Sequence, residues 1–467
     1  MKMEFINSAL STDNHLVDTN YVKNWIKDQN QKVDVRITKI RFNQLEKWMF
    51  SRETRNLKHV SGSFFSIDAV RIKTNWGEIN EWEQPIINQP EIGYLGFIVK
   101  EFNGILHFLM QAKIEPGNIN YVQLSPTLQA TKSNYTRIHN GKAPSYLEYF
   151  TKARSEQIIL DQLQSEQGAR FLKKRNRNII IKVTEEIPII DNFIWLTLAQ
   201  IKLLMYDDNL INMDTRTVIS GIPFGTLDKE EFNHLVSRYD LSLMGKFFLN
   251  SLLLNEYTYN SFDDIINYIT QKKCTLELEV EKISVYKIRD WHITDSCIEH
   301  TDKKYFKVIP TKVEIDSREV VSWTQPMIEP SQEGICVFVC KEINGVIHFI
   351  VQTKLEAGNF DIIEFAPTVQ CLTGNYRDSH SYPLPFLKYV LNVPSNQIIY
   401  DTLQSEEGGR FFREQNRNMI VLAGNEIINE LPDNYIWMTL NQLQTFIKFN
   451  NYINIQARSL LAAIKFN

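Results

Sequence analysis

The sequence lacks several features that would mark particular classes of protein. It has only five cysteines in 467 residues, all after residue 270, so a disulfide framework is excluded. No run approaches the roughly 18 uncharged apolar residues that a membrane span needs, and the polar N-terminus lacks the apolar segment of a signal peptide. The 51 Lys+Arg nearly balance the 55 Asp+Glu, which argues against a general nucleic-acid binder. We therefore expect a soluble cytoplasmic protein with neither membrane nor nucleic-acid partners.

The signature motifs of several enzyme classes are also missing. The patterns GxGxxG, GxxxxGK[ST] and GxSxG do not occur, so dinucleotide, P-loop and serine-hydrolase functions have no support. Cys336 and Cys340 share one face of a predicted strand, but neither a CxxC pair nor a histidine cluster accompanies them, and no metal site is predicted. Apolar residues make up 43% of the chain, which is enough for sizeable cores.

An internal duplication is the strongest pattern that is present. Residues 103–118 (NGILHFLMQAKIEPGN) match residues 344–359 (NGVIHFIVQTKLEAGN), and residues 161–178 match residues 401–418. The period is too long for a solenoid repeat, so we predict two homologous domains, residues 1–220 and 221–467. Apolar periodicity from Phe232 to Leu254 predicts a helix pair near the join, and we expect the two copies to pack against each other.

Each copy is predicted to be mixed α+β, in the order helix, strands, helices. Alternation over residues 105–114 predicts a strand that ends in a Gly-Asn turn, and residues 121–124 predict a second strand. Residues 162–175 and 402–415 look helical, each with one glycine. Trp195 and Trp437 are each expected to open a further helix.

One face of the predicted strand 105–114 carries His107, Gln111 and Lys113, and the second copy repeats this face. We predict that it lines a polar cleft, with an ordinary solvated face as the alternative. Trp82 and its counterpart Trp323 either fill the core or stack on a base.

The polar loop 125–142 is the second candidate region. Its arginine and lysines among amides suit a diphosphate, and Tyr135 and His139 add groups that transfer protons. Surface solvation is the alternative explanation, although long loops of this density often bind ligands. The second copy keeps Gln370, Asn375, Tyr376 and His380 but has fewer cations there.

The third candidate region is residues 164–170 (QSEQGAR), which both copies largely share. Glu166 and Arg170 stand at i, i+4, so a helix-surface ion pair is the structural interpretation. Gly168 and Gly408 would allow another backbone or a ligand to approach closely, which is typical of a site. The residues alone leave both roles open.

The paired blocks QAKIEPGN…LSPTLQATKSNYTRIHNG…LQSEQGARFLKKRNRN and QTKLEAGN…APTVQ…LQSEEGGRFF…NRN resemble those of the NDP-hexose 2,3-dehydratases. The resemblance runs from about Trp48 to Arg458. It implies two tandem Nudix-like domains per subunit, a homodimer, a dTDP-4-keto-6-deoxyglucose substrate in deoxysugar biosynthesis and no organic cofactor. It also implies that one nucleotide-sugar pocket is catalytic and the other a relic of the duplication. The glutamate run that binds metal in Nudix hydrolases is absent, so magnesium-dependent hydrolysis is not expected.

The implied reaction is a β-elimination. The C4 ketone acidifies the C3 hydrogen and the C2 hydroxyl leaves, which gives an enol that tautomerises to a 3,4-diketo-2,6-dideoxy sugar. Because this product is labile, a downstream ketoreductase or aminotransferase is the expected functional partner. Two other classes stay open: a divergent Nudix-type nucleoside-diphosphate-sugar pyrophosphatase and a non-catalytic nucleotide-sugar binding protein.

We favour the first copy as the catalytic one because its loop is more cationic and the substrate is anionic. Its catalytic candidates are Tyr135, His139, Glu166 and Lys113. Its substrate-binding candidates are Trp82, Gln111, Gln129, Lys132, Asn134, Arg137, Gln164, Arg170, Arg175 and Arg177. In the alternative, the second copy catalyses the reaction, with the site residues Gln352, Lys354, Asn375, Tyr376, Arg377, His380, Glu406 and Arg410.

Overall fold

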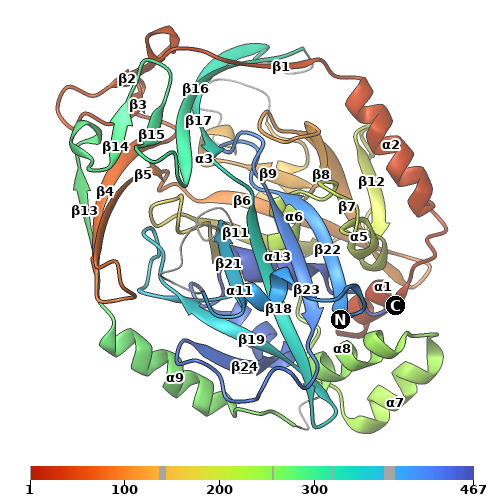
Figure 1. The fold of residues 1–467 in the computed structure, drawn as a ribbon. Coiled ribbons are helices and arrows are strands. Elements are labelled where there is room, and N and C mark those ends of the chain that lie inside the picture. The colour runs from red at the N-terminus through yellow and green to blue at the C-terminus, as the bar shows by residue number, and fades with distance from the viewer. Residues whose placement is uncertain (1, 136–142, 255–256, 317–319, 373–383) are drawn as a thin grey trace.

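The computed structural model describes residues 2–135, 143–254, 257–316, 320–372 and 384–467. The fold is mixed α+β and consists of two repeated halves, as the sequence predicts. Each half combines N-terminal helices, a small antiparallel sheet, a larger mixed sheet and C-terminal helices (Figure 1). Within the described ranges, no helix is long and apolar enough to cross a membrane.

The first half begins with α1 (Lys2–Leu10) and α2 (Thr19–Gln31). Its strands are β1 (Val35–Lys39), β2 (Trp48–Phe50), β3 (Leu57–His59), β4 (Ser66–Thr74), β5 (Glu81–Asn88), β6 (Gly93–Phe102), β7 (Ile105–Ile114), β8 (Val122–Ser125), β9 (Leu128–Ala130), β10 (Ile158–Ser165), β11 (Arg175–Lys182) and β12 (Phe193–Thr197). The remaining helices are α3 (Lys132–Tyr135), α4 (Leu147–Thr151), α5 (Leu198–Leu204) and α6 (Met213–Ser220).

The second half follows the same order. Its first helices are α7 (Lys229–Arg238), α8 (Leu243–Leu253) and α9 (Phe262–Thr275), so the helix pair predicted near the join is confirmed. Its strands are β13 (Leu278–Ile283), β14 (Trp291–Ile293), β15 (Ile298–His300), β16 (Phe306–Ile315), β17 (Ser322–Pro330), β18 (Gly334–Ile343), β19 (Val346–Lys354), β20 (Glu364–Ala366), β21 (Val369–Leu372), β22 (Ile398–Ser405), β23 (Gln415–Leu422) and β24 (Tyr435–Thr439). The remaining helices are α11 (Leu387–Leu391), α12 (Leu440–Ile447) and α13 (Ile455–Ala463).

The two small sheets exchange a strand. Strand β1 of the first half pairs antiparallel with β16 of the second, with Val35 opposite Ile315. Reciprocally, β13 pairs with β4, and Leu278 lies opposite Thr74. Figure 1 shows red β1 beside teal β16, although the two strands are far apart in the sequence. Each half therefore completes the small sheet of the other.

The large sheets have equivalent topologies. The first has the order β10-β11-β6-β7-β12, with β8 paired to β7 and β9 paired to β6, and the second repeats this arrangement. The β6–β11 and β18–β23 pairs are parallel. Strand β7 spans the predicted residues 105–114, and β8 lies one residue beyond the predicted second strand.

One buried hydrophobic cluster runs through both halves. Phe97 and Phe108 of the first large sheet belong to it, and so do Phe338 and Phe349 of the second. Burial of apolar surface is the main favourable contribution to folding, so the halves are held together by a shared core. The predicted packing of the two copies is confirmed.

The helices predicted over residues 162–175 and 402–415 are wrong. Residues 162–165 end β10, a turn follows, and β11 begins at Arg175. The second half repeats this with β22 and β23. The Gln, Glu and Arg residues of these segments suit a helix by intrinsic propensity, but apolar neighbours on both sides pair in the sheet, and this tertiary pairing overrides the propensity.

The helix starts predicted at Trp195 and Trp437 are also wrong, because both residues lie inside strands β12 and β24. The helices that follow, α5 and α12, begin at Leu198 and Leu440. Their N-caps are threonines at the ends of the two strands, Thr197 and Thr439, whose hydroxyl groups accept hydrogen bonds from backbone N–H groups of the first turn. The threonines, not the tryptophans, therefore mark where each strand gives way to a helix.

Candidate functional site

The repeated sequence blocks meet where the two halves contact each other. The backbone N–H of Gly117 donates to Gly408 O over 2.7 Å, and that of Gly358 donates to Gly168 O over 2.7 Å. Such reciprocal contacts are typical of approximate two-fold symmetry. A side chain on Gly117 would overlap the carbonyl of Phe411. The close approach predicted at Gly168 and Gly408 is confirmed, because side chains there would overlap asparagines of the opposite half.

Two buried arginines join the halves in the same reciprocal way. Arg216 of α6 donates to the backbone carbonyl of Ser405, and Arg458 of α13 donates to that of Ser165 over 2.5 Å. Each arginine is 1% exposed. Figure 1 shows α6 and α13 near the centre of the molecule. The matching arginines of the two copies therefore serve the contact between the halves.

A group of charged side chains lies beside this contact. The Asp214 carboxyl group lies close enough to four other charged groups for their charges to change its pKa. We call these five residues the first-half cluster: Lys113, Glu115, Glu166, Asp214 and Glu407. Glu407 is supplied by the second half. Lys113 and Glu407 are half-buried, so the cluster reaches solvent.

The local fold explains how this cluster is held. Lys113 lies in β7, and Glu115 follows the end of that strand. Glu115 Oε1 accepts a hydrogen bond from Gln129 Nε2 at 2.7 Å, and Gln129 Oε1 accepts one from Asn212 Nδ2 at 3.0 Å. Asn212 also caps α6, which places Asp214 in the first turn of that helix. A chain of hydrogen bonds therefore connects the end of β7 to the start of α6.

Burial makes three carboxyl groups of the first-half cluster, those of Asp214, Glu166 and Glu407, hold protons more strongly. It raises the pKa of Asp214 well above its ordinary value, and the charges of Glu115 and Glu166 add to the effect. Burial also raises the pKa of Glu166, against the opposing charge of Lys174. Burial, followed by the charge of Glu115, raises the pKa of Glu407 to about 7. Such groups are suited to acid–base chemistry near neutral pH.

Glu166 differs from its counterpart Glu406 in its hydrogen bonds. Glu166 Oε1 accepts from Asn176 Nδ2 at 2.7 Å, whereas its buried Oε2 has no hydrogen-bond partner among the described residues. Both oxygens of Glu406 accept, and one of them accepts from Gln167 Nε2 at 2.5 Å. Glu407 replaces Gln167 in the other copy, so Glu166 lacks the amide donor that Gln167 supplies to Glu406. This difference accounts for the unsatisfied oxygen of Glu166.

We call the equivalent group in the other half the second-half cluster: Lys354, Glu356, Glu406, Gln167 and Gln456. Its neutral Gln167 and Gln456 stand where the first-half cluster has Glu407 and Asp214. Glu356 Oε1 accepts from Gln370 Nε2 at 2.9 Å, as Glu115 does from Gln129. Over the described ranges, no group of three or more His, Cys, Asp or Glu residues is placed to hold a metal ion.

The structure brings three predicted site residues to the first-half cluster. Lys113 and Glu166 belong to it, and Gln129 holds Glu115. His107 lies elsewhere, because it is buried with Nδ1 donating to a backbone carbonyl at 2.8 Å and Nε2 3.0 Å from Asn14 Oδ1. The prediction that His107 lines a polar cleft is wrong.

Several predicted binding residues already have other partners. The Arg177 guanidinium donates two hydrogen bonds to Asp161, at 2.7 and 2.5 Å. Arg175 lies over the Phe360 ring at 4.0 Å. Trp82 is half-buried and packs against the hydrophobic core. A role in substrate binding stays a prediction for each of them.

The structural interpretation of Glu166 and Arg170 as a helix-surface ion pair is wrong, since no helix forms there. Arg170 lies 4.0 Å from Glu414 and 4.3 Å from the centre of the Phe306 ring, both in the second half. Arg410 makes the reciprocal ring contact in the first half. Both arginines therefore cross the contact between the halves.

The polar loop after β9 is described only at its start. Tyr135 Oη donates to Ile92 O at 3.3 Å, and burial raises the pKa of Tyr135. Lys132 is exposed, Gln111 is half-buried, and Gln164 and Gln352 are buried. Arg137, His139, Asn375, Tyr376, Arg377, His380 and the side chain of Asn134 lie outside the described residues.

Sequence reasoning missed Glu115, Asp214 and Glu407. The signal that marks two of them is a difference between the copies, since Asp214 aligns with Gln456 and Glu407 with Gln167. These positions are not shared by the two copies, so the repeat pattern alone does not mark them.

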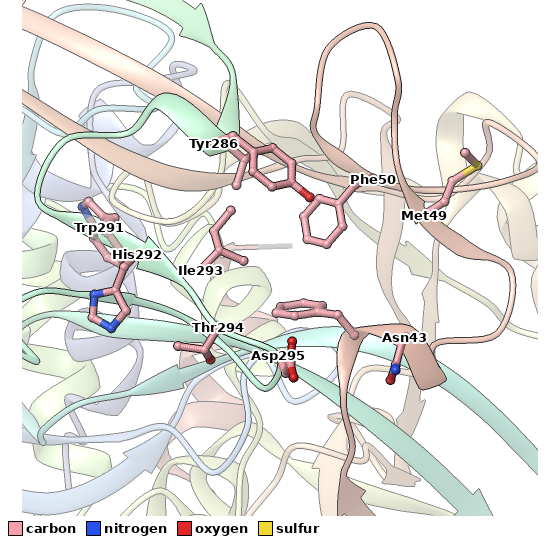
Figure 2. A pocket seen from close by; sticks show the side chains of 11 residues that line it. Asn43, Met49, Phe50, Tyr286, Trp291, His292, Ile293, Thr294 and Asp295 are labelled. Carbon is pink, nitrogen blue, oxygen red and sulfur yellow. The ribbon is translucent and has the colours of Figure 1, made fainter.

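A cavity of about 690 Å³ lies away from the two clusters, between segments 42–50 and 285–295. These segments are equivalent in the two halves. Figure 2 shows Phe50 and Tyr286 close together at this cavity, and their ring centroids are 5.4 Å apart. None of the predicted site residues lines it.

Comparison with known proteins identifies relatives that match nearly the whole chain. The family model for NDP-hexose 2,3-dehydratase matches residues 19–222 and 262–464. A dTDP-4-dehydro-6-deoxy-alpha-D-glucopyranose 2,3-dehydratase of Saccharopolyspora spinosa is 41% identical, over 98% of this chain and 94% of the relative. Proteins of the same name from Amycolatopsis orientalis and Streptomyces violaceoruber are 38% and 39% identical, over 98% and 96% of this chain and 92% and 98% of the relatives.

Proposed function

The chain belongs to the NDP-hexose 2,3-dehydratase family, and we propose that it removes water across C2 and C3 of dTDP-4-keto-6-deoxyglucose. The observation that carries this proposal is the match over 98% of the chain to a relative named for that reaction. The product is a 3,4-diketo-2,6-dideoxy sugar. The elimination is redox-neutral, so the proposal includes no organic cofactor.

We propose that the first-half cluster supplies the base and the charge-stabilising group that this reaction needs. A base takes the C3 proton, and we assign this role to Glu166, whose Oε2 has no partner among the described residues. Negative charge then develops on O4 of the sugar, where the Lys113 ammonium is suited to stabilise it. Tyr135 and His139 of the loop, which the sequence favours for moving the C3 proton and assisting the loss of the C2 hydroxyl with Glu166 as the competing base, stay predictions.

We further propose that the diphosphate binds the loop 132–142, with Arg137 as its main anchor. A guanidinium fork suits phosphate oxygens. Arg137→Ala should weaken dTDP binding, and calorimetric titration measures the loss. Unchanged affinity in that variant would place the diphosphate elsewhere.

Fold and assembly complete the proposal. We infer that each half, divided after Ser220, is Nudix-like. We also infer that the chain forms a cytoplasmic homodimer. Its product would be the substrate of a downstream ketoreductase or aminotransferase. The repeated mixed sheets, each with a parallel pair, support the first point. Light scattering on the purified protein tests the homodimer, and a monomeric mass would contradict it.

The activity is tested by incubating the protein with dTDP-4-keto-6-deoxyglucose and a trapping ketoreductase. With NAD(P)H present for the reductase, mass spectrometry should show a nucleotide sugar that has lost one water and gained two hydrogen atoms. Release of dTMP and a sugar phosphate on adding magnesium would instead indicate a pyrophosphatase. Binding without any change in mass would indicate a binding protein.

A further inference from the structure

Glu407 is the one carboxylate of the first-half cluster that the other half supplies. Its neighbour Gly408 is fixed against the first half, since Gly408 O accepts the Gly117 N–H at 2.7 Å. A Cβ on Gly408 would lie 2.8 Å from the Glu115 Cβ. The backbone contact between the halves therefore places Glu407 beside the end of β7.

The two-fold relation shows what Glu407 faces. In the second half, Gln167 donates to Glu406 over 2.5 Å. Glu407 aligns with Gln167 and Glu166 with Glu406, so Glu407 occupies the equivalent place beside Glu166. The charge of Glu166 also acts on the Glu407 carboxyl group in the structure. Two neighbouring carboxyl groups favour a state in which one is ionised and the other protonated.

We propose that Glu407 is a further catalytic residue of the first-half cluster, the acid that protonates the departing C2 hydroxyl while Glu166 takes the C3 proton. This inference rests on the proposed function. The C3–H electron pair becomes the C2–C3 double bond, the C2–O bond breaks, and the hydroxide accepts the Glu407 proton to leave as water. Glu166 ends protonated and Glu407 ionised, and one proton passing from Glu166 to Glu407 restores both.

The surroundings of Glu407 fit an acid that works near neutral pH. Glu407 Oε1 accepts the Gly409 N–H at 3.2 Å. Glu407 is half-buried rather than buried, which leaves part of the residue open to an arriving sugar. Five charged or titratable groups interact electrostatically with the Glu407 carboxyl group: Glu115, Glu166, Lys174, Arg410 and Asp214. With burial and Glu115 raising the pKa of Glu407 to about 7, its acid form declines above that pH.

The experiment compares kcat, KM and the pH profile of the full-length wild type and Glu407→Gln with dTDP-4-keto-6-deoxyglucose. Glu407→Gln gives the second loop the sequence QSEQG, which already folds in the first half. We expect kcat to fall by roughly 10²–10⁴-fold, dTDP affinity to persist, and the decline of kcat above about pH 7 to disappear. Glu407→Asp should restore part of kcat and the decline of kcat with pH. If Glu407→Gln does not fold, the comparison of Glu407→Asp with the wild type tests the proposal instead.

Glu364→Gln is the matched control. Glu364 Oε2 accepts from Ser165 Oγ at 3.0 Å, and its counterpart Gln123 makes the equivalent contact with Ser405 at 2.7 Å. This change also removes a buried carboxyl group, and it should leave kcat and its pH profile in place. Wild-type kcat in Glu407→Gln, or a lower kcat with an unchanged pH profile, would overturn the assignment. A wild type that does not dehydrate the sugar would overturn the proposed function itself.

Discussion

The two clusters have the same framework but different chemistry. Gln129 and Gln370 hold Glu115 and Glu356 in the same way in both halves. In the second-half cluster the Gln167 amide donates to Glu406 Oε2. In the first-half cluster Glu407 takes the place of Gln167, so a carboxyl group stands beside Glu166 instead of an amide. Glycines shared by the copies, such as Gly117 and Gly358, form the contact between the halves, whereas Glu407 and Gln167 differ and give the two clusters different charge.

The first prediction tests the shared framework and carries the largest expected effect. Gly117→Ala and Gly358→Ala should each destabilise the protein by more than about 3 kcal/mol, because the new methyl groups overlap backbone carbonyls of the opposite half. Urea unfolding measures the loss. Gly104→Ala is the control: its φ is +79° with open space around it, so only backbone strain of about 1–2 kcal/mol applies. Equal stability of all three variants would contradict a tightly packed contact.

The second prediction sharpens the electrostatic difference between the clusters. Glu115→Gln removes the negative charge that, after burial, does most to raise the pKa of Glu407. The pKa of Glu407 should therefore fall, and the decline of kcat should begin at a lower pH. Glu356→Gln, the matched change in the second-half cluster, should leave the pH profile of kcat unchanged. If the pH profile of kcat shifted in both variants, or in neither, the electrostatic difference between the two clusters would be contradicted.

The third prediction concerns a smaller difference between the halves. Lys202 is buried and donates to Ala462 O at 2.7 Å and Ile464 O at 2.8 Å, and its counterpart Gln444 also donates to two carbonyls. Burial lowers the pKa of Lys202 from 10.5 to about 7. Between these values the unfolded chain binds the proton that the folded chain lacks, so this residue makes stability rise with pH, by up to about 1.4 kcal/mol per pH unit.

Lys202→Gln should abolish that part of the pH dependence. Unfolding free energies of the variant and the wild type, measured from about pH 7 to pH 10, check this. Parallel curves would show that Lys202 does not titrate in this range.

The sequence predicts the duplication, strand β7 and the helix pair near the join, because a repeat, an alternation and a helical period can each be read directly from the residues. It does not predict the exchange of β1 and β13, since their pairing partners lie in the opposite half. The segment after Gln164 misleads for a related reason: its composition suits a helix, but contacts across the halves fix it as strand and turn. The sequence shows that Glu407 differs from its counterpart Gln167, but only the fold places this difference beside the first-half cluster.

The central claim is that the first-half cluster performs the elimination. The most direct measurement is kcat for Glu166→Gln against Glu406→Gln, at saturating substrate, with dTDP affinity and thermal unfolding confirming that both variants are folded. We predict a fall of roughly 10²–10⁴-fold for Glu166→Gln and retention of most of kcat for Glu406→Gln. The opposite pattern would contradict the claim and place the reaction in the second-half cluster.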